Sequence, residues 1–282
     1  MIDETVAEIR EMQTHSSSVV AVKATEALAE LLDREYASLD EFERDLEQNA
    51  GVLRRSDTSH ASLHNALREV ERSVVGEAAS IEEGKRLLED AIDRVVADVE
   101  SSKREAAANA AETFSDGETV LTHDYSTTVL EAIETATADG IELSTYVTEA
   151  RPRFLGRRTA RVLAGNPRVE ATIVVDGAMG YALRNCDRVV LGMTCISGET
   201  YYNRIGTFPL AATAAHLGVP VTVVGSSSKL IEEFHFETDD RAPVEVMREP
   251  IADVAVENPS YDATPMELVD RVITDEGVRD VE

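Results

Sequence analysis

The feature that most constrains the fold is a change in the spacing of apolar residues near Gly117. Before it, apolar residues recur at intervals of three and four, and no proline precedes Pro152. That spacing predicts amphipathic helices almost throughout the first 115 residues. After Gly117, short apolar runs alternate with helical stretches, which is typical of βαβ units and a parallel sheet. We therefore predict an α/β chain with a helical domain at residues 1–115 and a Rossmann-like domain at 116–282.

The elements of the two halves can be placed from these patterns. Three serines at 16–18 can cap the first strong helix, and a long helix is predicted from Ser80 to Thr113. The second half contains five candidate strands at 119–122, 142–148, 171–175, 188–191 and 219–224. Helices are predicted between them at 127–137, 157–164, 179–184 and 207–217.

Ligands of such sheets bind outside the carboxyl ends of the strands, so the segments after each strand are the candidate site. These segments are residues 122–126, 149–153, 176–180, 192–206 and 225–229.

Charge excludes some classes of function. The 282 residues include 54 acids and 27 bases, a formal net charge of −27. Such a surface repels phosphate backbones, and no basic run longer than two residues occurs outside 151–161, so we expect no direct nucleic-acid binding. Only four bases are lysine (Lys23, Lys85, Lys103 and Lys229). Dispersed carboxylates with few lysines predict a halophilic protein, and an ordinary acidic protein is the alternative.

Targeting and metal signals are absent from the sequence. The N-terminus has no signal-peptide pattern and no apolar run approaches ~18 residues, so we expect a cytoplasmic protein without membrane association. Cys186 and Cys195 form no CxxC motif, and His60 and His64 lack a third ligand. Neither a metal nor a cofactor is expected.

Five motifs occur at the predicted strand ends or beyond them, in a fixed order. They are Leu-Thr-His-Asp-Tyr-Ser at 121–126, Glu-Ala-Arg-Pro-Arg at 149–153, Asp-Gly-Ala-Met-Gly-Tyr at 176–181, Asn-Arg-Ile-Gly-Thr at 203–207, and Asn-Pro-Ser-Tyr-Asp-Ala-Thr-Pro at 258–265. Together they resemble one superfamily. It comprises the alpha, beta and delta regulatory subunits of translation initiation factor two-B, ribose-1,5-bisphosphate isomerase and methylthioribose-1-phosphate isomerase.

The resemblance implies a sugar-phosphate pocket, and the residue types agree with it. Arg151 and Arg204 can form charge-assisted bonds to phosphate oxygens. Asn203 and Arg204 stand where the family has asparagine and lysine. Arginine in place of lysine keeps the positive charge but changes how far the side chain reaches. Ser126 and the following helix N-terminus can add donors. The structural alternatives are an ordinary helix cap for Ser126 and an ion pair for Arg151.

Two lysines complete the predicted ligand set. Lys229 resembles the lysine of the family's serine–lysine segment, and a solvated loop lysine is the alternative. Lys23 lies in the region where the isomerases carry a phosphate-binding arginine–glycine pair, but the glycine is missing here.

The catalytic positions depart from the isomerase pattern. The isomerases of this superfamily have a cysteine directly after the threonine–histidine pair, where this chain has Asp124. Thr194 stands where their catalytic aspartate would be. Losing one acid or base group typically lowers the rate ~10²–10⁴-fold. His123 has no evident relay partner, so we expect it to orient the strand end. An altered chemistry through Asp124 or Cys195 is the alternative to lost activity.

These departures predict a regulatory protein like a subunit of initiation factor two-B rather than an enzyme. It would sense a sugar phosphate or nucleoside monophosphate and form a homo-oligomer, a dimer or higher, with initiation factor two as a candidate partner. The second hypothesis is a divergent ribose-1,5-bisphosphate isomerase, an aldose–ketose isomerase of nucleotide salvage. A structural assembly subunit without a ligand is the third.

Overall fold

The chain forms two compact units, Met1–Ser102 and Lys103–Glu282, which we call the N-terminal and C-terminal units. The computed structural model describes residues 2–10, 16–56, 61–231, 241–249 and 251–281. Helix α5 (Ile81–Ala111) runs through the division between the units. The boundary predicted from the sequence, between residues 115 and 116, stays a prediction.

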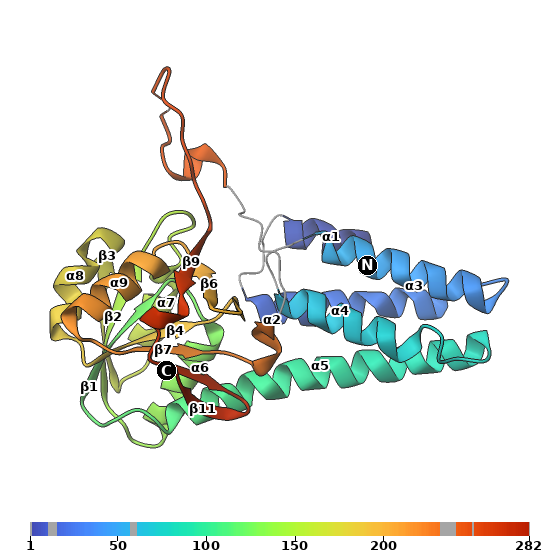
Figure 1. Cartoon of the computed structure of the whole chain (residues 1–282), viewed down its shortest axis with the longest axis horizontal. Helices are drawn as coiled ribbons and strands as arrows, with labels where there is room; N and C mark the ends of the chain where they lie inside the picture. Colours follow the sequence, from blue (N-terminus) through green and yellow to red (C-terminus); the bar gives the residue numbers. More distant parts are fainter. Residues whose placement is uncertain (1, 11–15, 57–60, 232–240, 250, 282) are drawn as a thin grey trace. The chain divides into compact units, whose positions relative to one another are not determined.

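The N-terminal unit is helical, as the apolar spacing predicts (Figure 1). Its helices are α1 (Ile2–Arg10), α2 (Ser17–Ala27), the 3-10 helix η1 (Leu28–Asp33), α3 (Leu39–Arg54), α4 (Ala61–Val74) and the first part of α5. Their apolar faces meet in one core that includes Leu28, Phe42 and Leu67, all fully buried. Each such leucine contributes about 1.5–3 kcal/mol by its burial. Ser38 caps α3 by accepting a hydrogen bond from the Glu41 amide.

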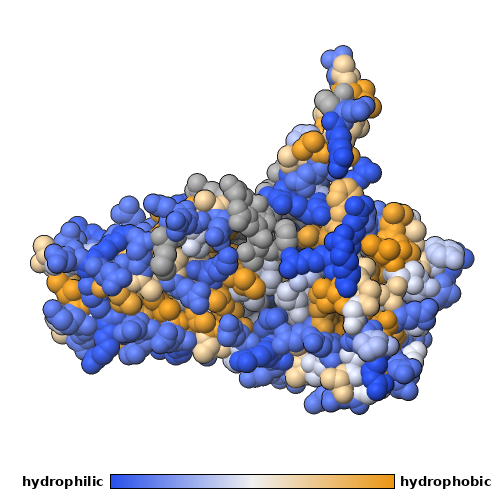
Figure 2. Space-filling model, turned by 180° about the vertical axis from the view of Figure 1, so that it is seen from behind, coloured by the Kyte–Doolittle hydropathy of each residue, from blue (hydrophilic) through white to orange (hydrophobic). Residues whose placement is uncertain are grey.

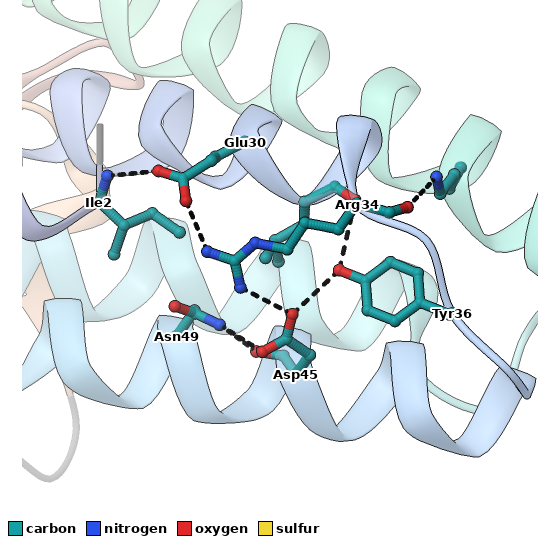
Figure 3. Close-up of polar contacts among 8 residues, drawn as sticks. Ile2, Glu30, Arg34, Tyr36, Asp45 and Asn49 are labelled. Atoms are coloured by element: carbon teal, nitrogen blue, oxygen red, sulfur yellow. Dashed lines mark hydrogen bonds and ion pairs between the residues drawn. The ribbon is translucent and has the colours of Figure 1, made fainter.

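A polar network on the surface of this unit ties three helices together (Figure 3). Arg34 donates to Glu30 and Asp45 at 2.5 and 2.8 Å, and Tyr36 also donates to Asp45. Glu30 accepts a hydrogen bond from the Ile2 amide at 2.9 Å. This bond, with the Arg34 contact, lowers the pKa of Glu30 to about 2. Nearby, Lys85 donates to two backbone carbonyls, those of residues 32 and 34.

The C-terminal unit is built on a seven-stranded sheet in the order β11-β10-β7-β4-β1-β2-β3. Its strands are β1 (Glu118–His123), β2 (Leu143–Glu149), β3 (Val169–Val175), β4 (Arg188–Gly192), β7 (Val221–Val224), β10 (Arg271–Thr274) and β11 (Gly277–Asp280). All neighbours pair in parallel except β10 and β11. The α/β fold with a parallel sheet is therefore confirmed.

Helices pack on both faces of this sheet. The end of α5, α6 (Thr127–Ala138) and α7 (Gly156–Ala164) share one core with Val120. The short helices α8 (Met179–Ala182) and η3 (Leu183–Asn185), together with α9 (Thr207–Leu217), share the other with Leu121. Adjacent residues of β1 thus serve opposite cores, as the alternation of side chains in a strand requires. On the surface, Lys103 pairs with Glu131 at 2.7 Å.

A second, four-stranded sheet was not predicted. It has the order β8-β5-β6-β9, with β5 (Cys195–Ser197), β6 (Thr200–Arg204), β8 (Leu230–Ile231) and β9 (Tyr261–Pro265). The 3-10 helices η2 (Asp176–Ala178), η4 (Ser227–Lys229), η5 (Pro243–Glu245) and η6 (Met266–Leu268) occupy connecting segments. Because β5 follows β4 after only two residues, this small sheet places β6 beside the carboxyl end of the large one.

Candidate active site at the strand ends

The order of strands reverses between β1 and β4, which marks the switch point where ligands bind in such sheets. The segments that follow β1 and β4 are in close contact there. A methyl group added to Gly192, the last residue of β4, would overlap the side chain of Ser126 after β1. Two of the segments predicted from the sequence therefore meet at this point.

Asp124 directly follows β1 and lies two residues before Ser126. Its backbone is left-handed, with a φ of 59°, a conformation that aspartate tolerates better than most residues. The side chain is 11% exposed, and its Oδ2 lies 3.6 Å from Nε of Arg204. Oδ1 is buried and has no hydrogen-bond partner among the described residues. Burial raises the pKa of Asp124, with the Arg204 charge acting in the opposite direction.

His123 has both ring nitrogens engaged. Nε2 lies 2.7 Å from the carbonyl oxygen of Ile205, so it carries a proton and donates it. Nδ1 lies 2.6 Å from Oγ1 of Thr148, the residue opposite His123 in β2. These bonds fit the orienting role expected of His123, because they join β1 to β2 and to the segment after β6.

Asn203 and Arg204, at the end of β6, face the same region. The Arg204 side chain is 14% exposed and its guanidinium lies over the Tyr261 ring at 4.7 Å. Asn203 is buried and donates to Oγ1 of Thr207 at 3.2 Å. The Thr194 hydroxyl is 3.5 Å from Oδ1 of Asn203. The structure thus brings together Asp124, Thr194, Asn203 and Arg204.

Ser126 and Arg151 have structural contacts as well as positions at the strand ends. Ser126 caps α6 by accepting a hydrogen bond from the Val129 amide at 3.3 Å. Arg151 is exposed, and its guanidinium donates to the carbonyl of Val246 at 2.8 Å. Among the described residues Arg151 contacts no carboxylate, and the ion pair considered as its alternative role stays a prediction.

Lys229 is not a solvated loop residue. It is 5% exposed, and its Nζ donates to the carbonyl of Met193 at 2.8 Å, just before Thr194. Burial lowers the pKa of Lys229 to about 8. Burial also raises the pKa of the neighbouring Cys195 thiol to about 12, which leaves that thiol un-ionised.

Lys23 lies on α2 of the N-terminal unit, where it pairs with Glu8 at 2.7 Å. Its side chain is 43% exposed. The ligand-binding roles expected of Lys23, Lys229, Arg151, Ser126, Asn203 and Arg204 stay predictions.

Two carboxylates near the strand ends were not assigned a role from the sequence. Asp262 accepts hydrogen bonds from the amides of Gly206 and Phe208 and so caps α9. Asp275 accepts from the amide and the hydroxyl of Ser227. Each occupies donors that a bound anion would otherwise use. The Tyr-Asp pair at 261–262 was visible as part of a motif, but nothing in a sequence reveals which amides a carboxylate will reach.

Two negative findings concern the described part of the chain. No helix there is long and apolar enough to cross a membrane. No group of three histidine, cysteine, aspartate or glutamate side chains gathers there in a way that could hold a metal ion.

The chain is therefore a two-unit α/β protein. A helical unit precedes a mainly parallel sheet that has helices on both faces, and charged residues lie at the switch point of that sheet. The chain belongs to the initiation factor 2 subunit family, whose family model matches residues 13–280. The superfamily inferred from the five motifs is therefore confirmed.

Relatives by sequence include enzymes and a translation factor. The ribose 1,5-bisphosphate isomerase of Haloterrigena turkmenica is 35% identical, over 97% of this chain and 88% of that one. The protein of the same name from Haloferax volcanii is 30% identical, over 98% and 88%. Translation initiation factor eIF2B subunit alpha of Caenorhabditis elegans is 28% identical, over 94% and 90%.

Solved structures share the fold. Translation initiation factor eIF-2B of Pyrococcus horikoshii OT3 superposes with a TM-score of 0.85 at 23% identity, covering 98% of this chain and 96% of that one. The 5-methylthioribose 1-phosphate isomerase of the same organism gives 0.81 at 22%, covering 99% and 84%. At these identities the likeness concerns the fold alone.

The expectation of a regulatory role like that of an initiation factor two-B subunit is wrong. Six archaeal relatives, 27–35% identical over 97–99% of this chain, are named ribose 1,5-bisphosphate isomerase. The second hypothesis agrees with them better. The regulatory inference rested on the missing cysteine and aspartate alone, whereas these relatives match nearly the whole chain.

Proposed function

We propose that the chain is an aldose–ketose isomerase acting on a pentose bisphosphate of the ribose 1,5-bisphosphate type. The observation that carries the proposal is the buried carboxyl of Asp124, directly after the strand-end histidine. One of its oxygens has no hydrogen-bond partner among the residues that the structure describes, and its pKa is raised. The names of the six archaeal relatives support the same substrate class.

The reaction requires one proton to move between oxygens. When a furanose bisphosphate opens and becomes a ketose, a hydrogen passes from C2 to C1, the ring oxygen gains a proton and the C2 hydroxyl loses one. Atoms and charge balance without a co-reactant. A carboxylic acid group can give its proton to the ring oxygen and regain one from the C2 hydroxyl. Asp124 suits this role because burial raises its pKa and so favours the protonated form.

Cationic and amide groups around Asp124 suit the rest of the substrate. Arg204 supplies a guanidinium beside the carboxyl, and the N-terminus of α6 after Ser126 offers a favourable place for a phosphate. In this proposal Thr194 and Asn203 hydrogen-bond sugar hydroxyls rather than exchange protons. Arg151 and Lys229 add positive charge near the strand ends, and Lys23 is the candidate from the N-terminal unit.

The test is an NMR turnover assay with ribose 1,5-bisphosphate in molar KCl. We expect the chain to form the ketose bisphosphate and Asp124→Asn to lower kcat by ~10²–10⁴-fold. Asp139→Asn is the matched control, because Asp139 is an exposed acid at the end of α6. Absence of turnover by the unmodified chain would refute the function. A normal rate in Asp124→Asn would refute only the role of Asp124.

Two finer proposals accompany this function. Calorimetry with a nucleoside monophosphate tests whether a second phosphorylated ligand binds. The homo-oligomer expected from the resemblance is tested by light scattering.

A further inference from the structure

Lys229 is a buried cation in a molecule whose charged side chains mostly face water. Hydrophilic residues cover much of the face drawn in Figure 2, whereas Lys229 is 5% exposed. Its ammonium has three donors, and one of them binds the carbonyl of Met193 at 2.8 Å. No carboxylate pairs with it among the residues that the structure describes. An anionic ligand can therefore use the other donors, provided that the segment carrying Lys229 is held in place.

That segment is η4, a single turn whose shape depends on neighbouring side chains. Ser226 caps the turn by accepting a hydrogen bond from the Ser228 amide at 3.3 Å. Asp275 accepts two bonds from Ser227, one from its amide at 2.6 Å and one from its hydroxyl at 2.7 Å. A helix of three residues is not stable by itself, so these bonds keep the turn in the conformation that buries Lys229.

Asp275 is itself supported by α5. The turn between β10 and β11, which contains Asp275, lies beside the end of that helix (Figure 1). There the Asn109 side chain donates to the carbonyl of Thr274 at 2.8 Å and to that of Asp275 at 3.4 Å. Hydrogen bonds therefore run from Asn109 through Asp275 and Ser227 to the turn that carries Lys229. All of these residues belong to the C-terminal unit.

The effect of Asp275 on Lys229 comes from this chain of hydrogen bonds. Burial is the main cause of the lowered pKa of Lys229, and the largest effects of other ionisable groups come from Cys195 and Lys103. The Asp275 carboxylate therefore acts through the shape of the turn rather than through its charge. Asparagine keeps an oxygen that can accept from the Ser227 amide, so it should replace Asp275, whereas alanine has no acceptor.

We propose that Asp275 is a positioning residue of the strand-end site, because it holds the turn that keeps the Lys229 ammonium beside the Met193 carbonyl, ready for an anionic ligand. Asn109 supports Asp275 in this role. The anion is a phosphate group of the sugar bisphosphate, a statement that rests on the proposed function. The positioning of Lys229 does not rest on it.

The first test is an NMR titration of the full chain in molar KCl with isotope-labelled lysine. The chain has four lysines, and Lys229→Met identifies the Lys229 signal by its loss. In the unmodified chain we expect Lys229 to titrate with a pKa of about 8. In Asp275→Ala this pKa should rise toward the ordinary value of 10.5, because the released ammonium reaches water. Asp275→Asn should keep the low value.

The matched control is Glu276→Ala, since Glu276 is the next acid in the same turn and is exposed. This variant should leave the titration of Lys229 unchanged. Asn109→Ala should raise the pKa of Lys229 in the same direction as Asp275→Ala, and it carries the test if circular dichroism shows that Asp275→Ala does not fold. An ordinary pKa for Lys229 in the unmodified chain, or an unchanged pKa in the folded variants, would overturn the proposal.

The second test measures the ligand. Calorimetry and turnover with ribose 1,5-bisphosphate should show Kd and KM raised by about tenfold or more in Asp275→Ala, with a smaller effect on kcat, as expected for one lost charge-assisted bond. Asp275→Asn should restore both constants. A shifted Lys229 with an unchanged Kd would overturn the role in ligand binding. Absence of turnover by the unmodified chain would refute the isomerase function and leave the NMR titration to decide the positioning.

Discussion

Asp124 combines a left-handed backbone with a buried carboxyl, one oxygen of which has no hydrogen-bond partner in the described part of the chain. From the sequence this residue is only a departure from the isomerase pattern. In the structure it directly follows β1 and lies beside Arg204, the last residue of β6. Its identity alone therefore indicated lost function, whereas its surroundings support the acid–base role that we propose for it.

Replacing this carboxyl should stabilise the protein. Because the pKa of Asp124 is raised in the folded state, that state binds the proton more tightly than the unfolded chain does. Stability is therefore lost as pH rises from the ordinary value of 3.8 through the folded pKa. At pH 7, Asp124→Asn should raise Tm, by about 2–4 °C for each kcal/mol recovered. Thermal unfolding followed by circular dichroism measures this, and a lower Tm at pH 7 would contradict it.

Lys229 should make the free energy of unfolding increase with pH in the alkaline range. Burial lowers its pKa from 10.5 to about 8, so between these values the unfolded chain holds a proton that the folded one has released. Stability then rises with pH through this window. Lys229→Met should be more stable than the unmodified chain at pH 7 and should lack the rise. Urea unfolding at pH 7.5 and 9.5 checks this, and an unchanged slope with pH in the variant would exclude Lys229 as its source.

At the scale of elements, the segment after β1 can approach the end of β4 closely because Gly192 has no side chain. Gly192→Ala should force Ser126 out of its capping position on α6 and destabilise the unit by about 1–3 kcal/mol. Gly177→Ala is the control, since nothing lies within 4 Å of the added methyl there. Denaturant unfolding of both variants measures the difference. Equal stabilities would show that the strand ends can separate at little cost.

The sequence predicted the large sheet better than the small one. Strands β4 and β7 are mostly apolar and buried along their whole length, a composition typical of central strands in a parallel sheet. Strand β9 contains an aspartate and a proline, and β8 has only two residues, so neither carries a recognisable pattern. The segments of the candidate site were located because they follow the apolar strands. The burial of Lys229 and the capping by Asp262 depend on tertiary contacts that no local pattern encodes.

At the scale of the whole molecule, a net charge of −27 should make folding depend on salt. The screening length falls from about 10 Å at 0.1 M to about 3 Å at 1 M salt, which weakens repulsion among dispersed carboxylates. We expect Tm to rise by several degrees between 0.1 and 2 M KCl. Sucrose at equal osmolality is the control for excluded-volume effects. A Tm that follows sucrose as closely as KCl would count against a halophilic protein.

Each of the four lysines forms an ion pair or a hydrogen bond, which limits the amine-directed reagents that can label the protein. Lys23 and Lys103 pair with carboxylates, while Lys85 and Lys229 donate to backbone carbonyls. Amine-directed crosslinkers, dyes and surface couplings will therefore react sparsely and in competition with structural contacts. Carbodiimides activate carboxyl groups, and the sequence contains 54 acidic side chains. Carboxyl chemistry, rather than amine chemistry, is the practical route to tagging or immobilising this protein.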